Sequence, residues 1–274
     1  MIVTERGTGA GPRPDVGAPA VKPAAPGAVV ADPDRDPATA ACWRALATVR
    51  DPELDEPITS LGFVANLSTE GRDDGYAVRA RLRLPTFFCA PNFAWLMVAD
   101  AADALRRVDS VRVVDVQLLD HFTSAEINEG VAAAAGYASR FAVAGEPDDD
   151  PELAELRRVF EVKAHRAAQD RLARALAAEG VAGEELVTLT LRESGRRAPE
   201  ATAALARRRR AVGLDTGPDA PAIADDEGRP VPVDRLPMWL RVARATRVSI
   251  DGNGALCRGL LDTRYGQTRS MVEP

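Results

Sequence analysis

The sequence contains no apolar run of the roughly 18 to 20 residues that a membrane-spanning helix needs. Its first 36 residues also lack the continuous apolar core of a signal peptide, so we recognise no export signal. A net charge of −6 gives no electrostatic attraction to nucleic acid or to an anionic membrane. We therefore expect a cytoplasmic protein that binds neither.

Cysteine is scarce, with only Cys42, Cys89 and Cys257 in 274 residues. They are far apart, odd in number and form no CxxC pair, which argues against a disulfide framework and a local zinc knuckle. Several catalytic signatures are missing as well. There is no HExxH, no GxSxG, and "IDGNG" fits neither a phosphate loop nor a dinucleotide fingerprint.

Residues 1–36 are rich in Pro, Gly and Ala and have few large apolar side chains, so we predict a disordered tail. A helix follows, capped by Asp36 with Pro37 in its first turn, and it ends before Pro52. "LGFVANL" is a strand candidate and "STEGRDDG" a polar turn. "YAVRARLRL" then alternates apolar residues with arginines, which predicts an antiparallel hairpin with one face on a core.

The next segments predict a helix from Pro91, a strand in "DSVRVVDVQLL" and a helix capped by Thr123 or Ser124. Residues 37–142 thus read α-β-β-α-β-α, a small α+β sandwich with helices on one face of the sheet. "AGEPDDDP" is a linker by composition. Residues 143–274 form a mainly helical extension, with helices from Pro151 to Glu179 and from Pro199 to Val212.

Two parts of the extension are less clear. The last segment has a glycine-rich stretch around Asn253, interpreted as a turn, and its pattern does not decide between helix and strand. The basic cluster "RRRR" at 207–210 predicts an exposed helix face or a docking patch for an acidic client.

Cys89 lies in "LPTFFCAPNFAWL", where a strand ends and a helix begins. Unpaired backbone N–H groups and the positive end of the helix dipole favour the thiolate there, which is the form that binds metal and attacks electrophiles. The alternative is plain burial, because free cysteine packs as a small hydrophobe. Position alone leaves both open.

A second candidate site is the acidic loop "RDPELDEPITSLGFV", residues 50–64, which contains Asp51, Glu53, Asp55 and Glu56. Hairpin topology can bring this loop close to the end of the second strand. Its acids are then placed to orient a metal or to accept protons from a thiol. A solvated loop of no specific role is the alternative.

Together, "DPEL", "PITSLGFV", "LPTFFCAPN", "VRVVDVQLL" and "TSAEIN" occur in an order that resembles the PaaD- and SufT-like family of metal-sulfur (iron-sulfur) cluster assembly domains. The resemblance covers residues of about 38 to 130. It implies an α+β domain in which an acidic loop lies near a reactive cysteine and which delivers metal or clusters to client enzymes.

By this resemblance, Asp51 and Glu53 match the acidic pair, Thr86 the threonine three residues before the cysteine, and Cys89 the cysteine itself. Leu61 and Gly62 match the family's LG pair. Two positions depart from the pattern. Ser60 replaces the acid before LG, which removes a ligand or acceptor, and Phe88 replaces a glycine, which makes the loop bulkier and suggests a different cargo or client.

One thiolate does not close a four-coordinate site, so a stable metal or cluster needs further ligands. The candidates are Cys257, His121, His165, the acids near Asp51 or a second subunit, and a homodimer is therefore among the expected assemblies. Each of these side chains also has an alternative without a metal: His121 lies in a surface loop, His165 lies on a helix surface, and Cys257 is simply buried.

The leading hypothesis is a non-enzymatic maturation factor that transiently holds iron or an iron-sulfur cluster for a client metalloenzyme. Long forms of the family resemble those accompanying bacterial di-iron monooxygenases, so such a client is expected by association. One alternative is a metal-free, chaperone-like adaptor in which Cys89 only packs. The other is a thiol enzyme with Cys89 as nucleophile and His121 as base.

Overall fold

The predicted hairpin forms the centre of the first half of the molecule. In this computed structural model, which describes residues 36–137, 151–181 and 183–266, β1 (Val64–Arg72) pairs antiparallel with β2 (Gly75–Arg83). Strand β3 (Val111–Leu119) adds parallel to β2, giving the order β1-β2-β3. The tail at 1–35 and all of the predicted linker except Pro151, which begins α5, lie outside the described residues.

The alternation in β2 is confirmed, because Val78, Ala80 and Leu82 are buried while Arg79 is exposed. The predicted turn over "STEGRDDG" was too long. Its first five residues, 68–72, continue β1, and the reversal takes place between Arg72 and Gly75, which pair with each other. The end of β1 is solvent-exposed, so its polar side chains are compatible with a paired backbone.

The helices of this half occur in the expected order. Helix α1 (Pro37–Leu46) is capped by the Asp36 carboxylate, which accepts from the N–H groups of Ala38 and Thr39. Helix α2 (Pro91–Arg106) buries its apolar stripe in the core. Helix α3 (Ser124–Ala132) covers the edge of β3, where the Asn128 amide bonds both the N–H and the carbonyl of Leu118.

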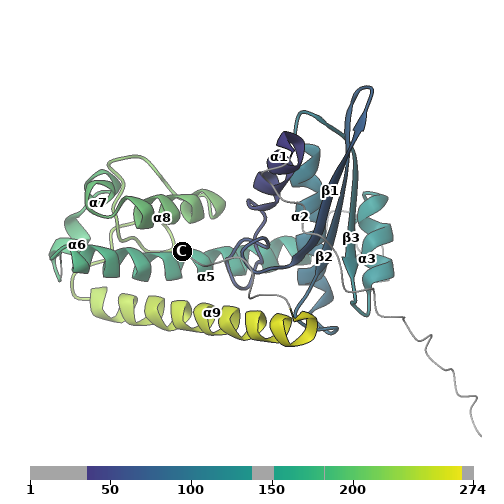
Figure 1. Cartoon of the computed structure of the whole chain (residues 1–274). Helices are drawn as coiled ribbons and strands as arrows, with labels where there is room; N and C mark the ends of the chain where they lie inside the picture. The colour runs from purple at the N-terminus through teal and green to yellow at the C-terminus, as the bar shows by residue number, and fades with distance from the viewer. Residues whose placement is uncertain (1–35, 138–150, 182, 267–274) are drawn as a thin grey trace, which may run out of the picture.

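The second half is helical, as expected. Its elements are α5 (Pro151–Ala178), α6 (Glu185–Thr188), α7 (Leu191–Arg197), α8 (Pro199–Ala211) and α9 (Leu236–Tyr265). The long helices α5 and α9 run side by side from the helical half to the sheet (Figure 1). Leu153 and Leu261, near their sheet ends, belong to the core that contains the sheet residues. None of the described helices is long and apolar enough to cross a membrane.

Helix α9 corrects the prediction of a glycine-rich turn around Asn253. Leu236, Ala243, Ile250 and Cys257 recur every seven residues and, with three of them buried and Cys257 half-buried, they define a packed helix face. Gly254 has a packing reason, because a Cβ atom there would lie 2.9 Å from Oε1 of Glu56. Close packing of the acidic loop against α9 thus explains a glycine that looked like a turn signal.

Candidate functional site

The Cys89 thiol lies in the loop between β2 and α2, where the sequence placed it. The side chain is half-buried, and its Sγ is 3.3 Å from the Thr86 hydroxyl oxygen. Ala90, at the N-cap of α2, supplies no side-chain cap, Pro91 has no N–H, and the Phe93 N–H donates to the Asn92 side-chain oxygen at 2.9 Å. The thiol therefore has a polar neighbour and is neither sealed in the core nor fully exposed.

His121 holds this loop through the backbone. Its Nε2 donates to the Cys89 carbonyl oxygen at 2.7 Å, and its Nδ1 accepts from the Thr123 N–H at 3.3 Å and hydroxyl at 3.1 Å. Burial lowers the pKa of the imidazole, which favours this neutral form. His121 is 3% exposed, so the surface-loop alternative was wrong. As a metal ligand it would have to give up one of these bonds.

Asp51 organises the acidic loop from a buried position. One carboxylate oxygen accepts from the N–H groups of Glu53 at 2.9 Å and Leu54 at 2.8 Å. Burial raises the pKa of Asp51 to about 6, and the two N–H donors oppose that rise. The Asp51 carboxylate thus fixes the shape of the acidic loop.

The expected LG pair also shapes this region. Leu61 is buried in the core, and Gly62 has φ of 75°, a left-handed conformation that favours glycine. Its N–H bonds the Thr59 carbonyl at 3.2 Å, closing a turn before β1. The pair therefore directs the chain from the acidic loop into the sheet.

Cys257 comes to this site from α9. Burial, together with the negative charges of Asp51, Cys89 and Glu53, raises the pKa of its thiol to about 11. Asn253 donates to Glu53 at 3.2 Å. Helix α9 and the acidic loop are therefore in contact, although Glu53 and Asn253 are 200 residues apart in the sequence.

His165 is placed elsewhere. It is 1% exposed in α5, its Nε2 finds no hydrogen-bond partner among the described residues, and its charged neighbours include Arg209 and Asp226. Burial lowers its pKa to about 4. The helix-surface alternative was wrong because this side of α5 packs against α8 in the helical half. No described contact joins it to the Cys89 loop.

Residues 39–118 match the family of iron-sulfur cluster assembly proteins. This assembly segment includes Asp51, Glu53, Thr86 and Cys89 but not Cys257, His121 or His165. Searches of curated proteins and of solved structures returned no match. Within the described residues, no group of three or more His, Cys, Asp and Glu side chains is arranged to hold a metal ion.

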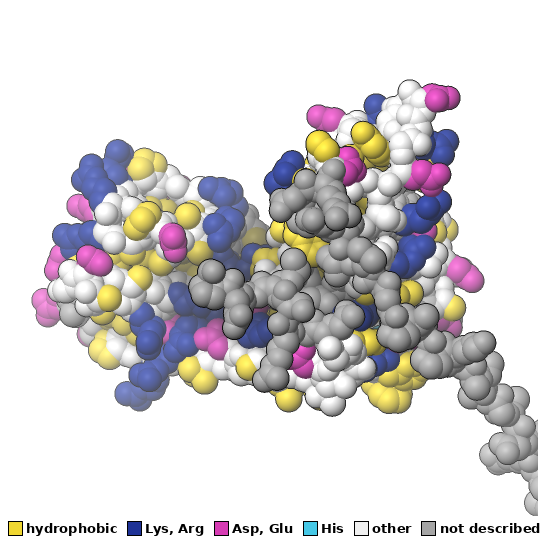
Figure 2. Space-filling view, in the orientation of Figure 1, with side chains coloured by type: hydrophobic (Ala, Val, Ile, Leu, Met, Phe, Trp, Pro, Cys, Tyr) yellow, Lys and Arg dark blue, Asp and Glu magenta, His cyan; other side chains and the backbone are white. Residues whose placement is uncertain are grey.

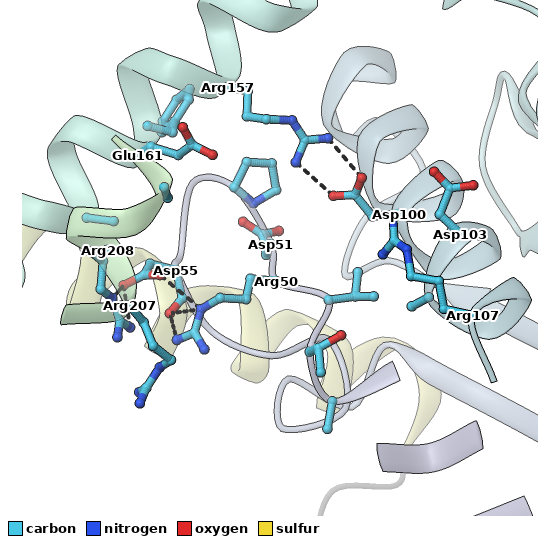
Figure 3. A pocket seen from close by; sticks show the side chains of 18 residues that line it. Arg50, Asp51, Asp55, Asp100, Asp103, Arg107, Arg157, Glu161, Arg207 and Arg208 are labelled. Carbon is cyan, nitrogen blue, oxygen red and sulfur yellow. Dashed lines mark hydrogen bonds and ion pairs between the residues drawn. The ribbon is translucent and has the colours of Figure 1, made fainter. Parts of the chain in front are cut away.

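A cavity of about 650 Å³ lies between the assembly segment and the helical half, and no sequence pattern predicted it. Asp51 lines it, so one side of the acidic loop faces this cavity (Figure 3). Arg157 of α5 binds Asp100 of α2 through two bonds of 2.9 Å. These contacts fix the two halves around the cavity.

The predicted basic cluster is split by this arrangement. Arg208 binds the buried Asp55 carboxylate at 2.7 and 2.9 Å, and Arg209 is 1% exposed and donates to the Ala222 carbonyl. Only Arg207 and Arg210 are exposed. Prediction of a continuous exposed face at 207–210 was therefore wrong, since a helix distributes four successive residues around its axis. Basic side chains do gather elsewhere on the helical half (Figure 2).

An exposed aromatic cluster lies next to the thiol. Phe87, Phe88 and Phe122 are 43%, 76% and 47% exposed, with ring centroids 5.0 to 6.2 Å apart. The His121 ring is 4.9 Å from that of Phe122. His121 thus links this phenylalanine cluster to the Cys89 backbone.

Proposed function

We propose that this protein holds iron or an iron-sulfur cluster as cargo at Cys89 and passes it to a client metalloenzyme, without itself being an enzyme. The match of residues 39–118 to the assembly family supports the cargo class. The observation that carries the proposal is the contact between the acidic loop and α9, the helix that contains Cys257: Asn253 binds Glu53 at 3.2 Å and Arg258 binds Glu56 at 2.6 Å. Thiolates and carboxylates are ligand types that suit iron.

In this proposal each side chain has a separate role. The Thr86 hydroxyl, 3.3 Å from Sγ, donates to the Cys89 thiolate, and His121 fixes the carbonyl of the same residue. The buried Asp51 shapes the loop and accepts a thiol proton when the cargo binds, consistent with a pKa of about 6. A partly closed donor set suits cargo that must leave again. Its client, on this view a di-iron monooxygenase component, would take the cargo in the cytoplasm.

The test is anaerobic incubation of the full chain with iron and sulfide, followed by absorption spectra and metal analysis after desalting. We expect Cys89→Ala to lose the bound cargo and Cys42→Ala to retain it, because Cys42 is 0% exposed in the core. Loaded protein should then transfer iron to the apo form of a di-iron monooxygenase component. Equal loading of wild type and Cys89→Ala contradicts the proposal.

A second candidate, the metal-free adaptor, is favoured by the phenylalanine cluster, because exposed apolar patches commonly mark binding sites for other proteins. It predicts that Cys89→Ser cells keep full client activity. The thiol-enzyme alternative has less support, since the described contacts of the His121 ring reach the Cys89 carbonyl and not its sulfur.

A further inference from the structure

Helix α9 exposes apolar side chains along its outer side. It lies at the outside of the helical half, next to α5 (Figure 1). Among the described residues, eleven large apolar side chains are exposed, and five of them belong to this one helix. These five are Met238, Val242, Val248, Leu256 and Leu260.

The middle of this helix face carries no charge. Eight residues between 245 and 260 are exposed, and together they define the α9 face: Ala245, Val248, Ser249, Gly252, Ala255, Leu256, Gly259 and Leu260. The charged side chains that border it, Arg247, Asp251 and Arg258, each have an ion-pair partner on α5, on α9 or in the acidic loop. Because a helix face that meets water normally carries charged and polar residues, the α9 face is typical of a protein contact.

Two glycines of the α9 face are not required by the packing of one chain. Among the described residues, a Cβ atom at Gly252 or Gly259 would meet nothing within 4 Å, whereas one at Gly254 would lie 2.9 Å from Glu56. Glycine weakens a helix relative to alanine, because it loses more backbone freedom on folding. A second helix supplies a reason for both glycines, since a position without a side chain lets another backbone approach closely.

The α9 face matches itself when two copies run antiparallel with Gly252 at the two-fold axis. Ala245 then lies at the level of Gly259 of the second copy, so small residues meet small residues. Val248 lies at the level of Leu256 of the second copy, so the larger apolar side chains fill the space on both sides of the close approach. Each of these pairings occurs twice in a two-fold contact. This match in size favours a second copy of the chain as the occupant.

Charge selects the antiparallel orientation. The exposed Arg241 and Arg244 precede the α9 face, and the exposed Asp262 follows it. Antiparallel packing places both arginines beside Asp262 of the second copy, whereas parallel packing places Arg241 opposite its own counterpart. Since the helix continues from Gly252 to Tyr265 at about 1.5 Å per residue, the C-terminal ends of the two helices are about 40 Å apart.

We propose that this chain forms an antiparallel homodimer through the α9 face, with Gly252 of both copies at the two-fold axis. Arg264, near the C-terminal end of α9, donates to the Leu84 carbonyl of the assembly segment. The two assembly segments therefore lie at opposite ends of the dimer, and their Cys89 loops do not meet. This dimer does not depend on the cargo.

The experiment is sedimentation velocity of the full chain over a range of concentrations, without added iron or sulfide. We expect a dimer that dissociates on dilution. Gly252→Leu inserts a side chain at the two-fold axis and should raise the dissociation constant about tenfold or more. The same variant should unfold at the wild-type temperature or above it, because the position is open within one chain and leucine favours a helix. Ala203→Leu adds a similar bulk at an exposed position of α8 and should leave the dimer intact.

A charge exchange tests the orientation independently. Asp262→Arg puts like charges beside each other in the antiparallel dimer and should weaken it. Adding Arg241→Asp and Arg244→Asp to that variant exchanges the signs and should restore the dimer. This comparison also holds if Gly252→Leu fails to fold.

Each alternative outcome counts against the proposal. A full chain that stays monomeric at every concentration overturns it. A dimer that Gly252→Leu does not weaken, or that Ala203→Leu weakens equally, shows that the α9 face is not the contact. A charge exchange that does not restore the dimer contradicts the antiparallel orientation.

Discussion

Asn253 of α9 donates a hydrogen bond from Nδ2 to Oε1 of Glu53, across 200 residues of sequence. Five residues further along the helix, Arg258 binds Glu56 at 2.6 Å. Both contacts are partly exposed, so each contributes little to stability. Their consequence is positional, because they fix the helix that presents Cys257 to the acidic loop of the assembly segment.

We therefore predict that the double variant Asn253→Ala, Arg258→Ala makes Cys257 more reactive toward iodoacetamide, since this part of α9 is then held less closely against the loop. The free energy of unfolding should fall by about 1 kcal/mol or less. Thr246→Ala is the control, because the Thr246 hydroxyl bonds only a carbonyl of its own helix in the described contacts. An unchanged labelling rate would show that these two contacts do not position the thiol.

The pair of Arg208 and Asp55 makes a stronger contribution. Their side chains are 11% and 8% exposed, and the carboxylate also binds Arg50. Arg208→Ala leaves a buried carboxylate with one of its two cationic partners, and we expect a loss of about 2 to 4 kcal/mol in urea unfolding. Arg207→Ala, one residue away and exposed, should change stability by about 0.5 kcal/mol or less. Similar losses in both variants would contradict this assignment.

His165 should make stability depend on pH. Burial lowers its pKa to about 4 in the folded protein, whereas the unfolded chain has the ordinary value of 6.5. Above pH 6.5 the imidazole is neutral in both states. As the pH falls from 6.5 to 4, the unfolded state binds a proton that the folded state refuses, so stability declines by about 3 kcal/mol in total.

Replacement of His165 by glutamine should remove this decline. We expect the difference in unfolding free energy between wild type and variant to be constant above pH 6.5 and to shift by about 3 kcal/mol in favour of the variant by pH 4. Asp51, whose pKa is raised to about 6, acts in the opposite direction over part of this range and is common to both proteins. Parallel stability curves would show that His165 is protonated normally.

Local patterns predicted the assembly segment well. The alternation in β2, the Asp36 cap of α1 and the stripe of α2 each depend on neighbouring residues, and each matches the described structure. The sequence also placed Cys89 correctly between a strand and a helix. Apolar side chains recur every 2 residues in a half-buried strand and about every 3.6 residues in an amphipathic helix. Such spacing can be read from a single sequence.

The relations that build the site are not encoded locally. Gly252 and Gly254 looked like a turn because isolated glycines weaken helices, and packing of α9 on α5 overrides that preference. Burial of His165 depends on α8, and the contact between α9 and the acidic loop depends on the path of the whole C-terminal half. Asn253 and Glu53 are 200 residues apart, and no periodic pattern in a sequence predicts contacts over such separations.

Thr86 provides the most direct test of the thiol. Its hydroxyl lies 3.3 Å from Sγ of Cys89, and a hydroxyl that donates to sulfur stabilises the thiolate over the thiol. Thr86→Val keeps the shape and removes the donor, so iodoacetamide should label Cys89 several-fold more slowly at neutral pH. Thr86→Ser restores the donor and should recover the wild-type rate, while thermal unfolding distinguishes a lost hydrogen bond from a disturbed loop. If valine and serine variants react alike, the hydroxyl does not support the thiolate, and Cys89 must owe any reactivity to the start of α2 alone.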